Sequence, residues 1–138
     1  MSLRWPSLGR RRPRGDRALG PRGERAAARR LRRDGWRVIA RNVRSRHGEL
    51  DLVALDPAHP GVLIVVEVKA GQAGAALPPE VRVTPAKQRK IVALAAELAR
   101  RRGLGSHAVR FDVIAVDFDA EGHVADLRHH AGAFASHV

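Results

Sequence analysis

Apolar residues recur at helical spacing in the segment between residues 23 and 34. One face, defined by the i, i+3, i+4, i+7 spacing, holds Glu24, Ala27, Ala28 and Leu31. The arginines of the segment lie mostly on its other faces, and Gly35 supplies a helix stop. The pattern predicts a basic helix whose inward stripe carries one acid, Glu24.

A second helical pattern begins at Thr84-Pro85, an N-cap residue followed by proline at the first helical position. Its apolar face holds Ile91, Leu94, Ala95 and Leu98. Three arginines at positions 100–102 fall in the last turn, where cations suit the helix dipole, and Gly103 follows. The pattern predicts a helix from Pro85 to about Arg102.

Five segments follow strand patterns, namely residues 36–40, 50–55, 62–69, 109–118 and, more weakly, 124–128. The apolar run at 62–66 is typical of a strand buried on both faces. A proline- and glycine-rich turn at 56–61 separates it from the strand at 50–55, which predicts an antiparallel pair. We expect residues 42–48 to form a polar turn.

The predicted order is one helix, three strands, one helix and two strands. This order indicates a three-layer α/β domain around a mixed sheet. A chain of 138 residues fits one domain of ordinary size. We expect residues 1–20 to form a flexible basic arm, because prolines and glycines interrupt it, and residues 21–138 to form the domain.

The positive charge lies in the first third of the chain. The sequence has 26 Lys+Arg against 14 Asp+Glu, a net charge of +12. Residues 1–46 hold sixteen arginines and three acids, whereas residues 47–138 have a net charge of −1. A block of like charge is either solvated or binds an anion such as a nucleic-acid phosphate, and both interpretations stay open.

Composition excludes several classes of protein. The absence of cysteine excludes a disulfide framework and a thiolate zinc site. The apolar run at 62–66 is far shorter than the roughly 20 residues of a membrane span. The N-terminal arginines are not followed by the apolar stretch of a secretory signal. We therefore expect a cytoplasmic protein with no membrane partner.

Two acids and a lysine fall on the predicted antiparallel strands. Glu67 interrupts an apolar run, where a carboxylate is costly unless it is paired or binds a cation. Strand alternation puts Glu67 and Lys69 on one face, and antiparallel pairing brings Asp51 close. Carboxylates and the Val68 carbonyl are hard oxygen ligands that suit Mg²⁺ or Mn²⁺, beside a lysine able to orient or deprotonate water. A structural ion pair of Lys69 with either acid is the alternative.

The spacing of Asp51, Glu67 and Lys69 resembles the D-(x15)-E-x-K pattern of the PD-(D/E)XK nuclease superfamily. A longer ordered set of strings resembles the YraN family, a bacterial family of uncertain function that is similar to Holliday-junction resolvases. The strings are Gly23-Glu24-Arg25-Ala26-Ala27, Arg41-Asn42-Val43-Arg44, Gly48-Glu49-Leu50-Asp51-Leu52-Val53, Val66-Glu67-Val68-Lys69, Lys87, Arg110-Phe111-Asp112-Val113, His130 and Ala133-Phe134. The resemblance covers about residues 20–134.

The resemblance implies a restriction-endonuclease-like (αβββαβ) fold and a divalent-metal site. The implied catalytic residues are Asp51, Glu67, Lys69 and the accessory acid Glu24, and the implied metal ligands are Asp51, Glu67 and the Val68 carbonyl. A glutamate favoured by the helix N-terminal dipole is the alternative for Glu24. Glu49 shares a face with Asp51 by alternation and is a weaker candidate. The family usually shows Thr-Arg after the lysine, whereas this chain has Ala70-Gly71, which removes a phosphate-contacting arginine.

Basic and polar residues near these strands are candidate nucleic-acid contacts. They are Arg41, Asn42, Arg44 and Arg46 before the Asp51 strand, and Lys87 in the first turn of the second helix. A polar hairpin and a solvated lysine are the alternatives.

We therefore expect an endonuclease that uses Mg²⁺ or Mn²⁺ to hydrolyse DNA phosphodiesters, with branched DNA among its candidate substrates. The alternative is a non-catalytic nucleic-acid-binding module that retains the fold, and a third option is a structural interaction protein. The resemblance leaves a homodimer open, because resolvases of this kind act as dimers.

Overall fold

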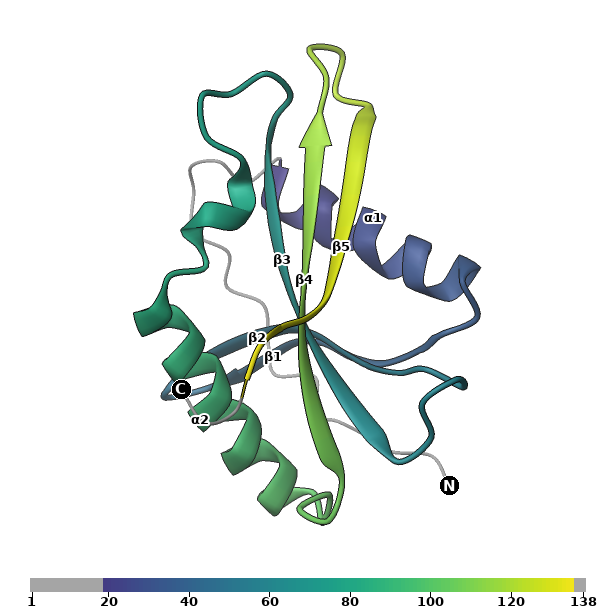
Figure 1. Cartoon of the computed structure of the whole chain (residues 1–138), viewed down its shortest axis with the longest axis vertical. Helices are drawn as coiled ribbons and strands as arrows, with labels where there is room; N and C mark the ends of the chain where they lie inside the picture. The colour runs from purple at the N-terminus through teal and green to yellow at the C-terminus, as the bar shows by residue number, and fades with distance from the viewer. Residues whose placement is uncertain (1–18, 136–138) are drawn as a thin grey trace.

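The elements follow the predicted order along residues 19–135, the part of the chain that the computed structural model describes (Figure 1). They are α1 (Leu19–Arg33), β1 (Arg37–Ser45), β2 (Gly48–Leu55), β3 (Val62–Gln72), the short 3₁₀ helix η1 (Pro79–Arg82), α2 (Pro85–Arg101), β4 (Ala108–Phe118) and β5 (Val124–Phe134). The strands form one sheet in the order β1-β2-β3-β4-β5, in which β3 and β4 are parallel and the other pairs are antiparallel. This is the predicted three-layer α/β fold with a mixed sheet.

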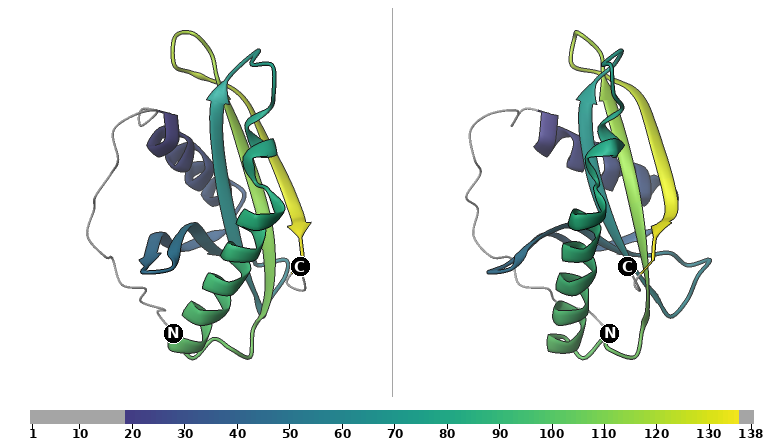
Figure 2. Two further views of the ribbon diagram at one scale, coloured as in Figure 1. Left: turned by 90° about the vertical axis from the view of Figure 1, so that its left-hand side faces the viewer. Right: turned by 60° about the vertical axis from the view of Figure 1, so that its left-hand side comes forward.

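A hydrophobic core lies on each face of the sheet, one under α1 and one under α2 (Figure 2). The α1 core joins Ala27, Ala28 and Leu31 to residues of β3 and β4 such as Ile64 and Ile114. The α2 core is built around Ile91, Leu94 and Leu98. Full burial of an aliphatic side chain stabilises the fold by about 1.5–3 kcal/mol, so these cores hold the layers together. In the described residues, neither helix is long and apolar enough to cross a membrane.

The first helix starts earlier than its apolar pattern predicts. It begins at Leu19, so that Pro21 falls in the first turn, where a missing N–H costs no helical hydrogen bond. It ends at Arg33, and the predicted helix stop Gly35 follows with a φ of 86°, while the N–H of Trp36 donates to the Leu31 carbonyl at 2.9 Å. Leu19 and Gly20 thus belong to α1, and the rest of the predicted arm lies outside the described residues.

The turn predicted at residues 42–48 is wrong, because β1 continues to Ser45 and the turn is formed by Arg46 and His47. These polar residues belong to the β1–β2 hairpin, whose end extends beyond the part of β2 that pairs with β3. Asn42 adopts a φ of 52° within β1, a conformation that asparagine tolerates better than most other residues. A turn-forming residue is therefore used inside a strand.

The last strand is longer than predicted and runs to Phe134. Its own sequence is polar, but its pairing with β4 adds apolar contact, including Phe134 stacked on Phe111 with ring centroids 5.1 Å apart. Tertiary pairing thus overrides the weak local pattern.

The pairing of β2 with β3 is short. It joins residues 52–54 to residues 64–66, whereas β3 pairs with β4 over eleven residues from Val62 to Gln72. The β1–β2 hairpin therefore leaves β3 beyond Leu52, and Figure 2 shows it diverging from the long strands. The next residues on the two strands are Asp51 and Glu67, and we call this point the β2–β3 fork.

Candidate functional site

Asp51 lies where β2 separates from β3. Its Oδ2 accepts a hydrogen bond of 2.8 Å from the Val68 N–H, so a side chain replaces the β2 backbone as the partner of β3. Burial raises the pKa of Asp51 well above its usual range, and the carboxylates of Glu67 and Glu24 raise the pKa further. The Val68 hydrogen bond and Lys69 offset this only in part. Asp51 is thus a fixed carboxylate in a site short of positive charge.

Glu24 reaches the fork because α1 lies very close to β3. A Cβ atom at Gly23 would stand 2.8 Å from the Cβ of Ala70, so glycine permits the approach. Carboxylate oxygens of Glu24, Glu49 and Asp51 lie within 4.8 Å of one another. Because α1 begins at Leu19, Glu24 lies beyond the first turn, and the helix dipole does not account for its position.

Asn42 lies against the same carboxylates. Arg41 pairs with Leu52 and Val43 with Leu50, which places Asn42 beside Asp51. In the orientation that satisfies its amide, the side-chain nitrogen donates to Glu24 Oε2 at 2.8 Å and to Glu49 Oε1 at 3.1 Å. The side chain therefore faces the acids and links α1 to the hairpin, while its contact with nucleic acid stays a prediction.

Glu67 is 5% exposed and lies between two lysines. Its Oε1 is 3.6 Å from Lys69 Nζ and 3.5 Å from Lys87 Nζ. The predicted cap at Thr84 is confirmed, since its Oγ1 accepts from the Lys87 N–H at 3.3 Å, and this first turn of α2 brings Lys87 to the fork. Lys87 thus joins the acidic site directly.

The pKa values of the two lysines shift in opposite directions. Burial lowers the pKa of Lys69, and the neighbouring Lys87 lowers it further, against the opposing effect of Glu67. The pKa of Lys87 is raised, because its hydrogen bond with Lys69 and the attraction of Glu67 and Asp51 outweigh burial. Lys69 is therefore the better proton acceptor and Lys87 the better permanent cation.

The oxygen atoms at the fork fit a hard divalent cation. Three carboxylates from α1 and β2 come close enough to share one ion, and Mg²⁺ or Mn²⁺ prefers such oxygen ligands. This cluster overlaps the predicted ligand set at Asp51 and adds Glu49, which strand alternation alone had placed on the same face. Glu67 and the Val68 carbonyl stay predicted ligands.

The predicted basic contacts occupy different places. Arg41 is exposed, and Arg44 Nε lies 3.2 Å from Glu49 Oε2. Arg46, at the hairpin turn, donates from Nε to His47 Nε2 at 3.2 Å. Arg44 and Arg46 line a groove of about 630 Å³ whose complete lining is Val43, Arg44, Ser45, Arg46, Leu98, Arg101 and Arg102. Sequence reasoning assigned the two α2 arginines to the helix dipole and gave no signal that they face the hairpin.

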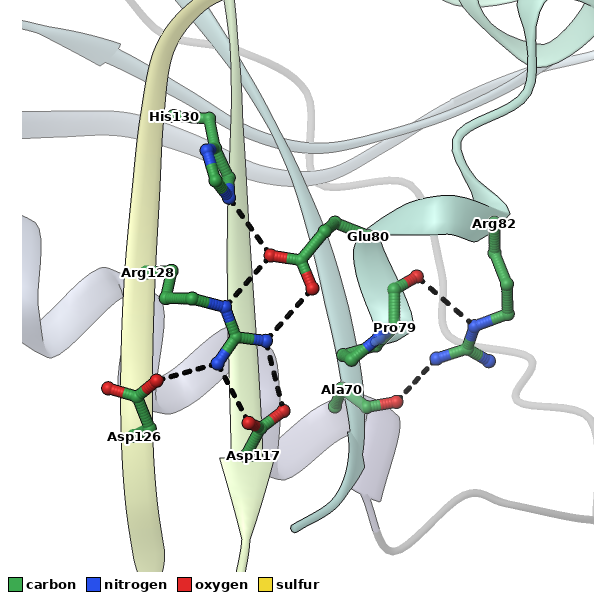
Figure 3. A network of polar contacts seen from close by, with 8 residues as sticks. All are labelled: Ala70, Pro79, Glu80, Arg82, Asp117, Asp126, Arg128 and His130. Carbon is green, nitrogen blue, oxygen red and sulfur yellow. Dashed lines mark hydrogen bonds and ion pairs between the residues drawn. The ribbon is translucent and has the colours of Figure 1, made fainter. Parts of the chain in front are cut away.

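The strand end after Lys69 is held by η1. Arg82 donates to the Ala70 carbonyl at 2.5 Å and to the Pro79 carbonyl at 3.4 Å (Figure 3). A Cβ atom at Gly71 would lie 3.4 Å from the Cβ of Pro79. The small residues at 70 and 71 therefore match the close approach of η1.

Comparison with known proteins adds a family to this geometry. The profile described as Uncharacterised protein family UPF0102 matches residues 23–116, which include most of α1, the fork and most of β4. A UPF0102 protein of Anaeromyxobacter dehalogenans is 45% identical over 104 residues, covering 75% of each chain. Another, from Symbiobacterium thermophilum, is 44% identical over 106 residues, which cover 77% of this chain and 87% of the relative. The chain therefore belongs to the UPF0102 family, the YraN family that its motifs resemble.

Proposed function

We propose that the protein is a nuclease that uses a divalent cation to hydrolyse DNA phosphodiester bonds. The observation that carries the proposal is the convergence of Glu24, Glu49 and Asp51 within 4.8 Å at the β2–β3 fork. The ion-paired group of Glu67 and Lys69 stands beside it, on the strand that donates a hydrogen bond to Asp51. Acidic ligands next to a lysine of lowered pKa are the parts that phosphodiester hydrolysis needs.

The residues divide into holding and reacting groups. Asp51, Glu24 and Glu49, with Glu67 beside them, would hold Mg²⁺ or Mn²⁺. Such an ion, when bound, polarises a phosphoryl oxygen and acidifies a water. The Lys69 amine has a lowered pKa, which suits it to orient a water and accept its proton.

Lys87 has a separate task in this proposal. Its raised pKa keeps it charged at neutral pH, and its Nζ is 3.5 Å from Glu67. A fixed cation there pairs with Glu67 and would offset negative charge that develops on the phosphate.

Cleavage of single-stranded, duplex and branched DNA with Mg²⁺ or Mn²⁺ tests the proposal. Asp51→Asn and Lys69→Met should each lower the rate by about 100-fold or more, the usual cost of losing acid–base or electrostatic catalysis. Asp126→Asn is the matched control, because it neutralises a half-exposed carboxylate outside the fork. The proposal is wrong if the pure protein cuts none of these DNAs, or if the fork variants cut like the control.

A non-catalytic nucleic-acid-binding module is the second candidate, and Ala70-Gly71 favours it. These residues stand where the family usually shows Thr-Arg, and η1 covers them. Such a module binds DNA with log K falling by about 0.9 per phosphate neutralised, but gains no stability from Mn²⁺. A melting temperature that rises with Mn²⁺ in the wild type, and not in Asp51→Asn, supports the nuclease instead.

A further inference from the structure

We propose that the groove between the β1–β2 hairpin and the end of α2 binds the phosphodiester backbone of a DNA strand whose scissile phosphate lies at the β2–β3 fork. We call it the arginine groove. Its basic lining consists of Arg44 and Arg46 on the hairpin and Arg101 and Arg102 on α2. The assignment of this strand as substrate rests on the proposed function, whereas binding by the groove is measurable without cleavage.

The fold builds the groove from two distant parts of the chain. Beyond the fork the hairpin leaves β3 and packs on α2, with Val43 and Leu50 in the same core as Leu94 and Leu98. A Cβ atom at Gly48 would lie 3.5 Å from Leu94 Cδ2, so the hairpin end lies close to the helix. This packing fixes the two basic walls relative to each other.

The walls carry more positive charge than their acidic neighbours remove. Arg44 pairs with Glu49 at 3.2 Å, and Arg101 pairs with Glu97 at 2.8 Å. The guanidinium groups of Arg44, Arg46 and Arg101 thus face two carboxylates, and the Arg101 side chain is 60% exposed. Guanidinium forks match phosphate oxygens geometrically, so a chain of phosphates complements this surface.

Glu49 links the acidic cluster to the Arg44 wall of the groove. This carboxylate directs Oε2 to Arg44 in the groove and Oε1 to Asn42 at the fork. A DNA strand bound along the groove would therefore run towards the acids of the fork. This link favours a nucleic-acid backbone over an isolated anion as the occupant, because a chain of phosphates extends from the groove towards the fork.

The test is binding of a fluorescent DNA strand, measured by anisotropy without a divalent cation and again with Ca²⁺. The variant Arg101→Gln with Arg102→Gln keeps two good helix formers and removes two charges. The matched control is Arg32→Gln with Arg33→Gln, which removes two exposed arginines from the last turn of α1. Both variants remove two positive charges at the C-terminal end of a helix, so the loss of favourable dipole interaction is similar. The groove variant also loses the exposed Arg101–Glu97 ion pair, which contributes little to stability.

We expect the groove variant to bind about tenfold more weakly near 0.1 M salt, with a salt slope reduced by about 1–2, and the control to change less than twofold. Equal losses of affinity in both variants, no loss in either, or no DNA binding by the wild type would contradict DNA binding by the groove. Groove-dependent binding without cleavage would support DNA binding by the groove and contradict the proposed nuclease activity. Cleavage with an unchanged KM in the groove variant would support the proposed nuclease activity and contradict DNA binding by the groove.

Discussion

Carboxylates gather at two places in the molecule, and the two clusters differ in what neutralises them. At the β2–β3 fork, oxygens of Glu24, Glu49 and Asp51 lie within 4.8 Å of one another. Between η1, β4 and β5, three other carboxylates surround Arg128, in a cluster that we call the Arg128 network (Figure 3). The Arg128 network contains a cation at its centre, whereas the fork brings three carboxylates close enough to share a metal ion.

The Arg128 network is closed by hydrogen bonds. Arg128 donates to both oxygens of Glu80 at 2.9 and 2.8 Å, to Asp117 at 2.7 Å and to Asp126 at 2.6 Å. His130 Nε2 lies 2.9 Å from the same Glu80 carboxylate. The guanidinium of Arg128 lowers the pKa of Glu80 to about 2, which is the opposite of the shift at Asp51.

Burial alone does not explain why the pKa values of Glu80 and Asp51 shift in opposite directions. Asp112 is fully buried, and burial raises its pKa, yet hydrogen bonds from His129, Arg110 and the Gly132 N–H lower it to about 2. Among the described residues, no basic side chain lies within ion-pairing distance of Asp51. A carboxylate whose pKa the fold raises is therefore the better marker of an external cation than a carboxylate that is merely buried.

Removing the central cation of the Arg128 network should have the largest effect. Arg128→Met leaves Glu80, Asp117 and Asp126 together without their donor, and should lower the free energy of unfolding by about 2–3 kcal/mol, less than for a fully buried pair because Arg128 is partly exposed. Urea denaturation measures the change. Arg29→Met, on the exposed side of α1, is the control and should change stability by less than about 0.5 kcal/mol. Equal losses in both variants would show that the network is not structural.

Neutralising one acid in each cluster should shift stability in opposite directions. Glu80→Gln should destabilise the protein by about 1–2 kcal/mol at pH 7, because a charge-assisted bond to Arg128 is lost. Asp51→Asn should stabilise the metal-free protein by about 1 kcal/mol, because its ionised form is disfavoured in the fold. Parallel urea titrations measure both changes. A loss of stability in Asp51→Asn would contradict the proposed difference between the fork and the Arg128 network.

The pH dependence of the same pair follows from the directions of the two shifts. The pKa of Glu80 falls from 4.5 to about 2 on folding, so its contribution is complete above pH 4.5 and is lost as the pH falls towards 2. The raised pKa of Asp51 has the opposite sign, since its cost is present at neutral pH and is absent below about 3.8. The advantage of Asp51→Asn should therefore disappear in acid.

The smallest effect is expected at Asn42, which joins two acids of the fork. Asn42→Gly keeps the φ of 52° accessible, whereas Asn42→Ala does not, so alanine should be about 1 kcal/mol less stable than glycine. Both variants lose the amide bonds to Glu24 and Glu49 and should alter the Mn²⁺-induced rise in melting temperature equally. A Mn²⁺ response like that of the wild type would mean that the amide does not organise the cluster.

The sequence predicts the order of elements well because the apolar patterns are strong. The stripe of Ala27, Ala28 and Leu31 and the run at 62–66 are the centres of the two-sided core, and the Thr84 cap is where it was expected. The failures lie where tertiary contacts decide. The hairpin extends because Asn42 tolerates a left-handed conformation, and β5 extends because β4 provides its partner.

Site prediction divides along the same line. Local spacing is enough to place Glu67 and Lys69 on one face, and the antiparallel turn is enough to bring Asp51 near them. The contact of Lys87 with Glu67 depends on where α2 begins in space, and the facing of Arg101 with Arg46 depends on how the hairpin leaves the sheet. The hydrophobic and polar pattern of the sequence predicts neither the Lys87–Glu67 contact nor the position of Arg101 opposite Arg46.

The short pairing between β2 and β3 affects which part of the molecule unfolds most easily. Three residue pairs join these strands, whereas eleven join β3 to β4, so the sheet divides into units of unequal local stability. We expect the β1–β2 hairpin, which carries Asn42, Glu49 and one wall of the arginine groove, to exchange its amide hydrogens before β3 and β4 do. If a DNA strand binds across both walls, it would bind only the form in which the hairpin is folded, so that DNA binding and hairpin folding would be linked equilibria.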